Sequence, residues 1–227
     1  MKKNVKILAG FLLLFCLVGC ASLPERERFI VSLTSPHIEL GEIELQFDTF
    51  LSLSGLKKEK ISVLYYPQED AVCLRFRYEL VTYHQFWNRK GRQEFITALE
   101  KYNEDYDARE LITNTRRSRR IYGLVEGYLI WQMYSFTTQA RAQSYVDLGY
   151  MFKDRAPYFT IYQRQAEYME GHSRDNYRTS AIVTKYFTRS QAAELAEFFK
   201  PEFLQNIVSS GNVVLPDEEA PPDRDEY

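Results

Sequence analysis

Four arginines within five residues form the densest group of side chains able to bind a charged ligand. Arg116, Arg117, Arg119 and Arg120 surround Ser118. Guanidinium groups at this spacing could hold a phosphate or a carboxylate through charge-assisted hydrogen bonds. We therefore treat them as a candidate contact for an anion or an acidic partner. The alternative is a solvated loop that leads into a strand, because runs of like charge usually face water.

A second group has only part of the pattern of a calcium loop. Asn103, Asp105 and Asp107 have the alternating spacing of its first ligands. Ala108 stands where the loop needs glycine for its sharp turn, and Asn114 stands where it needs a bidentate glutamate. We predict no metal here.

The remaining chemistry-bearing residues are scattered. His37, His84 and His172 are far apart in the sequence, and none has a cysteine or a second histidine at ligand spacing. The chain has no nucleophile elbow, phosphate-binding loop or dinucleotide fingerprint. We therefore expect no catalytic residue, no metal and no cofactor.

The N-terminus has the layout of a secretory signal. Lys2, Lys3 and Lys6 are basic, an apolar run of about a dozen residues follows, and Gly19 precedes Cys20. A membrane-spanning helix needs roughly 20 apolar residues, so an uncleaved membrane anchor is the weaker interpretation.

The four residues Leu17-Val18-Gly19-Cys20 resemble the lipobox of bacterial prolipoproteins. The resemblance implies lipidation of the Cys20 thiol by a diacylglyceryl group, cleavage after Gly19, and acylation of the new amino group by a chain such as palmitate. Two or three chains give stable membrane anchoring. Ala21 after the cysteine resembles an outer-membrane address, on the periplasmic or the surface side. Besides Cys20, only Cys73 would remain in the mature chain, so no intrachain disulfide is possible.

Charge patterning argues against nucleic-acid binding. The chain has 29 basic and 31 acidic residues, and its acidic excess is concentrated after Leu215. The domain before that point is formally neutral, whereas a nucleic-acid binder would show a basic excess. The tail is rich in Pro, Asp and Glu and cannot bury a core. We expect a signal peptide over 1–19, a lipidated tether over 20–28, one domain over 29–208 and a disordered acidic tail over 209–227.

Most of the domain has the period-two pattern of strands. In the clearest segment, Leu74, Phe76, Tyr78 and Leu80 alternate with Cys73 and charged residues, which predicts a sheet with one wet face. Similar patterns predict six further strands. They cover approximately residues 42–50, 61–66, 121–134, 142–152, 158–169 and 179–187.

Two segments have helical periodicity. Phe95, Leu99, Tyr102 and Tyr106 share one face of a helix over about 92–106. Near the C-terminus, the sequence from Thr188 to Gln191 fits a capping box that begins another helix. A second short helix could start at Pro201.

These elements predict an α+β fold. We expect a curved antiparallel sheet of about six to seven strands, with one central helix and a C-terminal helix packed on one face. Such a sheet could roll into a half-barrel with an apolar cavity under the helices. The late strands are rich in tyrosine, namely Tyr145, Tyr150, Tyr158, Tyr162 and Tyr168. These side chains either line the concave face as a binding surface or simply pack in the core of the sheet.

Three functions fit these expectations. The leading one is a non-enzymatic binding module of the bacterial envelope, anchored through Cys20, that takes a lipid-like ligand or a protein partner. The second is a scaffold or assembly lipoprotein that uses the arginine cluster or the acidic tail. The third is an envelope hydrolase, which would need a cleft with two close carboxylates. The carrier form of the first hypothesis requires that Phe95, Leu99 and Trp131 do not pack into a solid core.

Overall fold

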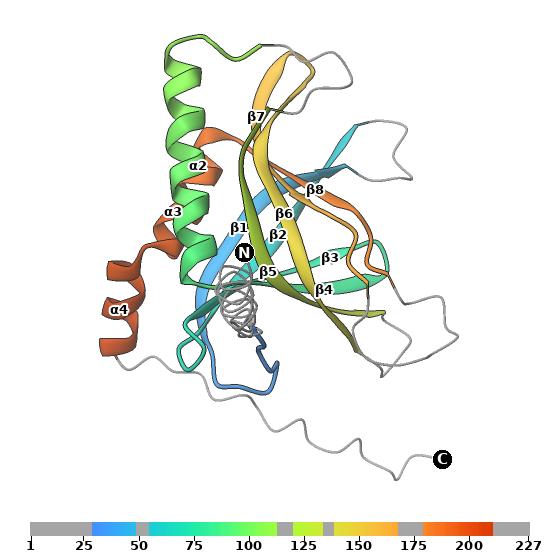
Figure 1. Ribbon diagram of the computed structural model, residues 1–227, viewed down its shortest axis with the longest axis vertical. Coiled ribbons are helices and arrows are strands. Elements are labelled where there is room, and N and C mark those ends of the chain that lie inside the picture. Colours follow the sequence, from blue (N-terminus) through green and yellow to red (C-terminus); the bar gives the residue numbers. More distant parts are fainter. Residues whose placement is uncertain (1–28, 49–54, 113–119, 134–138, 168–178, 211–227) are drawn as a thin grey trace, which may run out of the picture.

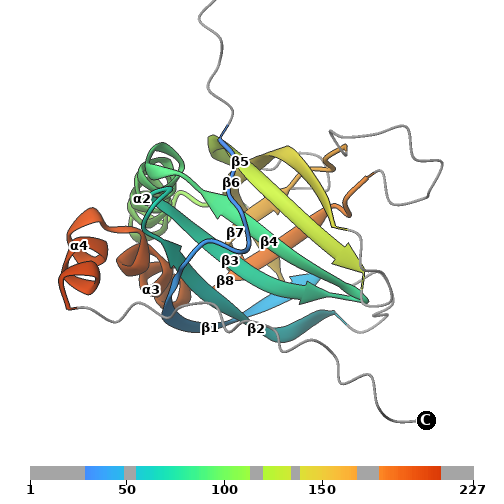
Figure 2. The ribbon, with the colours of Figure 1, turned by 90° about the horizontal axis from the view of Figure 1, so that it is seen from below.

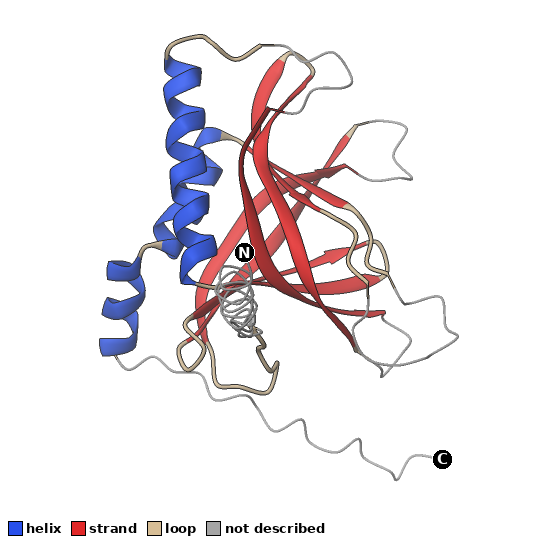
Figure 3. Ribbon diagram, viewed as in Figure 1, coloured by secondary structure: helices blue, strands red, loops and turns tan. Residues whose placement is uncertain are grey.

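A closed β-barrel with helices at one end forms the described part of the chain (Figures 1 and 3). The computed structural model describes residues 29–48, 55–112, 120–133, 139–167 and 179–210. Its strands are β1 (Ile38–Asp48), β2 (Leu56–Tyr66), β3 (Ala71–Tyr78), β4 (Val81–Trp87), β5 (Arg120–Met133), β6 (Ala140–Lys153), β7 (Ala156–Gln163) and β8 (Val183–Phe187). Its helices are α2 (Arg89–Asp107), α3 (Arg189–Phe199) and α4 (Pro201–Ser209).

The prediction of an open, curved α+β sheet was wrong. Each strand pairs antiparallel with the next, and β8 pairs with β1, so the sheet closes on itself. The missed strand is β4, which follows β3 after a two-residue turn at Glu79 and Leu80. Glu79 has a positive φ of 55° without being glycine, so the usual sequence signal of a tight hairpin is absent. Leu80, which we expected to face inward with β3, is exposed in this turn.

Apolar side chains from alternate strand positions fill the barrel. On β1, Ile43, Leu45 and Phe47 are buried, and the residues between them are polar. An eight-stranded barrel is just wide enough for such side chains to meet at its axis or to enclose one small ligand. The predicted alternation of apolar and polar residues is therefore present on β1, and its apolar side faces the inside of a closed barrel.

Helices α2 and α3 lie across one end of the barrel, as two perpendicular views show (Figures 1 and 2). Helix α2 includes the predicted segment, and it begins where the side chain of Asn88 accepts a hydrogen bond from the Gly91 amide. Helix α3 has the predicted capping box between Thr188 and Gln191, and α4 follows at Pro201. The rings of Phe95 on α2 and Phe199 on α3 are 4.9 Å apart and close this end of the barrel.

Part of the outer barrel face is also buried. Val31 packs on a second apolar cluster, with Phe29 and Leu33 at its margin. This cluster includes Cys73 and Phe86, which point away from the barrel interior. Cys73 is fully buried, so the expectation that it lies on a wet face was wrong. The N-terminal segment covers what would otherwise be an exposed apolar patch.

Within the described ranges, no helix has both the length and the hydropathy needed to span a bilayer.

Candidate functional site

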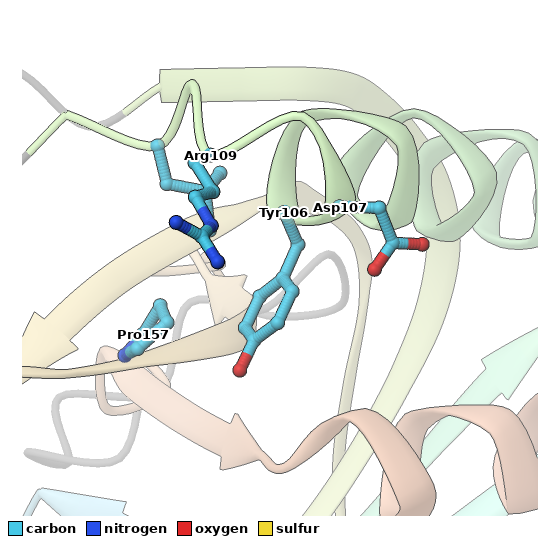
Figure 4. Close-up of a pocket in the computed structure, with 5 residues that line it drawn as sticks. Tyr106, Asp107, Arg109 and Pro157 are labelled. Carbon is cyan, nitrogen blue, oxygen red and sulfur yellow. The ribbon is translucent and has the colours of Figure 1, made fainter.

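A surface pocket lies where α2 ends. It has a volume of about 440 Å³, within the usual range for ligand pockets, and it is lined by Tyr106, Asp107, Arg109, Leu111 and Pro157. Figure 4 shows the guanidinium group of Arg109 directed into the space between Tyr106 and Pro157. A lining of mixed polarity, with Leu111 and Pro157 beside a cation, suits a molecule that has an apolar body and an anionic group.

The backbone of Arg109 has a conformation that normally favours glycine. The Arg109 amide donates to the Tyr106 carbonyl, and the Glu110 amide donates to the Asp105 carbonyl, which is a Schellman motif. Arg109 occupies its left-handed position with φ of 59°. A side chain there costs roughly 1 kcal/mol or more relative to an unstrained position. The interaction of a cation with the C-terminal end of the helix dipole does not require this strain, because an arginine in place of Ala108 would have the same interaction from an ordinary backbone conformation.

Tyr106 separates Arg109 from a paired arginine. The guanidinium carbon of Arg189 lies 4.4 Å from the centroid of the Tyr106 ring. Arg189 also donates two hydrogen bonds to the carboxylate of Asp107, at 2.8 and 3.2 Å. Figure 4 shows the Asp107 carboxylate on the other side of the ring from Arg109. Among the residues that the structure describes, no hydrogen bond or ion pair engages the guanidinium of Arg109, so it is available for a ligand.

The structure describes one of the predicted arginines. Arg120 at the start of β5 is 3.3 Å from Asp105 and lies over the Tyr122 ring. Tyr122 donates a 2.6 Å hydrogen bond to the same carboxylate, so Arg120 belongs to a local ion pair. Arg116, Arg117 and Arg119, together with the lipidation candidate Cys20, lie outside the described residues.

A polar pair crosses the barrel interior. The ammonium of Lys185 on β8 donates a 3.0 Å hydrogen bond to Oε1 of Gln85 on β4, on the opposite wall. It also lies 4.0 Å from the centroid of the Phe76 ring, a cation–π contact. Lys185 is completely buried, and this desolvation lowers the pKa of its ammonium to about 7.

The predicted aromatic face does not form one surface. Tyr150 is buried inside the barrel, whereas Tyr145 points outward and is exposed. Tyr158 and Tyr162 are partly exposed on the outer side, and Tyr168 lies outside the described residues. Because the sheet closes, the strands have no open concave face. Phe95, Leu99 and Trp131 are buried in one continuous core, which argues against a carrier cavity under the helices.

Two patterns in the sequence are related to the Lys185–Gln85 pair and to the pocket at Arg109. Lys185 has the same strand parity as Val183 and Phe187, which marks it as a cation on an apolar face. The helix that ends near Asp107 has no glycine after it, so a left-handed residue at its end has to carry a side chain.

The comparisons with known proteins give a family without an assigned activity. A family model described as "Uncharacterised Treponema protein" matches residues 26–206. An uncharacterised protein of Treponema pallidum (strain Nichols) is 25% identical over 157 residues. That alignment covers 69% of this chain and 56% of the relative, so the chain spans little more than half of that relative's length. No solved structure matches the chain. The match over most of the chain shows that it belongs to this family of uncharacterised Treponema proteins.

Proposed function

We propose that this protein is a lipid-anchored binding module of the cell envelope that recognises the anionic group of an amphiphilic molecule in the pocket at the end of α2. The observation that carries the proposal is Arg109, whose guanidinium has no partner among the described residues and is directed into the pocket from a strained backbone position. Strain of this kind persists where the surrounding structure or a function compensates for it.

The anchor comes from the sequence. The lipobox-like residues Leu17 to Cys20 support attachment to a membrane, with the outer membrane as the proposed site. A membrane-attached pocket is surrounded by amphiphiles with phosphate groups. Tyr106, Leu111 and Pro157 supply apolar surface for the acyl or glycerol part, and Arg109 supplies charge-assisted donors for the phosphate.

Binding can be tested with short-chain lipids that stay in solution. The chain from residue 20 onward, with Cys20→Ser, would be titrated by calorimetry with dihexanoyl phosphatidic acid and with dihexanoyl phosphatidylcholine. We expect the acid to bind more tightly, because choline neutralises the headgroup. Arg109→Gly should weaken binding of the acid about tenfold, or about 1.4 kcal/mol.

The same variant tests the strain argument. Arg109→Gly should fold normally and should gain up to about 1 kcal/mol of unfolding free energy, because glycine adopts positive φ without a steric penalty. Arg155→Gly is the matched control. Arg155 also has a positive φ, of 67°. Unlike Arg109, it is not one of the residues that line this pocket. It should gain stability without losing affinity for phosphatidic acid. Equal loss of binding in both variants, or no preference for the acid, would contradict the proposal.

A further inference from the structure

Several buried polar atoms at inward strand positions have no hydrogen-bond partner among the described residues. Seven buried side-chain atoms have no hydrogen-bond partner among the described residues. Four of them belong to side chains at inward strand positions. They are Nε2 of Gln85, Nε1 of Trp87, Oγ of Ser144 and Oε1 of Gln163. Buried polar groups are nearly always satisfied, so each of these atoms could accept or donate to a water, an ion or a ligand.

The chemistry around Lys185 is that of a donor. The Gln85 carbonyl oxygen accepts from the Lys185 ammonium, which fixes the amide so that its NH₂ group is the unpartnered end. The ammonium has three N–H groups, and one is used in that bond. The pair therefore presents ammonium and amide donors together, and these select an acceptor, above all an anion.

Nothing charged on the facing strands neutralises Lys185. Its paired neighbours are Phe47 on β1 and Ile161 on β7, and its ring contact is Phe76 on β3. Tyr83 stacks on Phe76, and burial raises the pKa of its phenol to about 12, so it is neutral. A buried cation without an opposite charge is costly, and a bound anion would relieve that cost.

The pair lies in the middle of the barrel, below the rings that close the helix end. Gln85 is two residues along β4 from Trp87, and Lys185 is two residues along β8 from Phe187. The Lys185–Gln85 pair is thus bordered by apolar rings on the side of the helices.

Among the described residues, the strand pairing is shortest along the seam between β1 and β8. Within the described residues, β1 and β8 share only two residue pairs, and one of these is Phe47 with Lys185 itself. By comparison, β5 and β6 share eleven pairs. Local opening of the β1–β8 seam would therefore expose the Lys185 side chain at a low cost in backbone hydrogen bonds.

Side chains fill the interior in this structure. We therefore propose a second binding site that forms when the β1–β8 seam opens, in which Lys185 and Gln85 hold the carboxylate of a small organic acid and its apolar body packs among the aromatic rings. This site is separate from the pocket at Arg109. The ligand class follows from the donors and from the apolar walls.

The test compares three ligands of one shape: hexanoate, hexan-1-ol and hexylamine. Thermal unfolding of the chain from residue 20 onward, with Cys20→Ser, would be followed at pH 6 with each at millimolar concentration. Ligand that binds only the folded chain raises the melting temperature. We expect a rise of several degrees with hexanoate and none with the amine. The rise should fade as the pH increases above 7, because Lys185 then loses the proton that binds the carboxylate.

Two variants keep the test decisive. Lys185→Met and Gln85→Leu should each remove or greatly reduce the hexanoate effect, and either one suffices if the other fails to fold. Arg109→Gly should leave it unchanged, which separates this site from the proposed surface site. An equal rise with hexanol, or no rise with hexanoate, would overturn the proposal, and the unpartnered polar atoms would then bind only water.

Discussion

At the scale of single residues, Lys185 makes folding depend on pH in a defined direction. Burial lowers the pKa of its ammonium to about 7 in the folded chain, from the ordinary value of 10.5. At a pH between these two pKa values, the unfolded chain binds more protons than the folded chain, so the free energy of unfolding rises with pH. Below pH 7 both states are protonated, and the full cost of burying the charge is present.

Lys185→Met should therefore stabilise the protein most at low pH. Methionine has a similar length and no charge, and replacing a buried charge with a packed apolar side chain is often stabilising. The gain in unfolding free energy over the wild type should be largest at pH 6 and should shrink toward pH 10. Urea unfolding of both chains, without added acid, measures it. A gain that does not change with pH would mean that Lys185 does not titrate as stated.

Cys20 has its own residue-scale prediction, which uses a neighbour as control. If the lipobox interpretation is correct, Cys20→Ser abolishes metabolic labelling of the protein with palmitate and releases it from the membrane fraction. Cys16→Ser should change neither result, because Cys16 leaves with the signal peptide. Labelling that survives loss of Cys20, or that requires Cys16, would contradict the assignment.

At the scale of elements, the segment before β1 acts as a cover for the outer barrel face. Val31 is 2% exposed within the outer cluster, whereas its neighbour Ile30 is 57% exposed. Cys73 lies in the same cluster, and burial strongly raises the pKa of its thiol, so the thiol should be unreactive in the folded chain.

Val31→Asp should lift this cover. A buried carboxylate without a partner is costly, so the segment should detach and expose Cys73. In the chain with Cys20→Ser, beginning at residue 20, Cys73 is the only thiol, and its reaction with Ellman's reagent reports the change. We expect reaction in the Val31→Asp variant at a denaturant concentration where the wild type and Ile30→Asp stay unreactive. The idea fails if both aspartates expose the thiol equally.

The elements were more predictable than their closure. Strand alternation, the α2 periodicity and the Thr188 capping box are local patterns, and local geometry decides them. Strand β4 was hidden because Glu79 takes a position usually marked by glycine. The pairing of β1 with β8 joins segments about 140 residues apart, and no local pattern specifies it. Both candidate sites depend on that closure or on a strained helix end, so spacing in the sequence did not reveal them.

At the scale of the whole molecule, the number of paired residues differs between neighbouring strands of the barrel. The β1–β8 seam has two residue pairs among the described residues, against eleven between β5 and β6. Backbone groups at a short seam open with a smaller loss of hydrogen bonds, so local opening should concentrate there. Lys185 lies in this seam, and the weakest part of the wall therefore coincides with the buried cation.

Hydrogen exchange can test this coincidence directly. Peptides covering residues 44–48 and 183–187 should exchange faster than peptides covering 125–131. Hexanoate should slow the first two at pH 6 and should have no such effect on the Lys185→Met variant, because the bound carboxylate would join β8 to β4 through Lys185 and Gln85. Uniform exchange around the barrel would remove the proposed entry route. Slowing by hexanoate that persists without Lys185 would instead place the acid elsewhere on the protein, and the interior site would have to be abandoned.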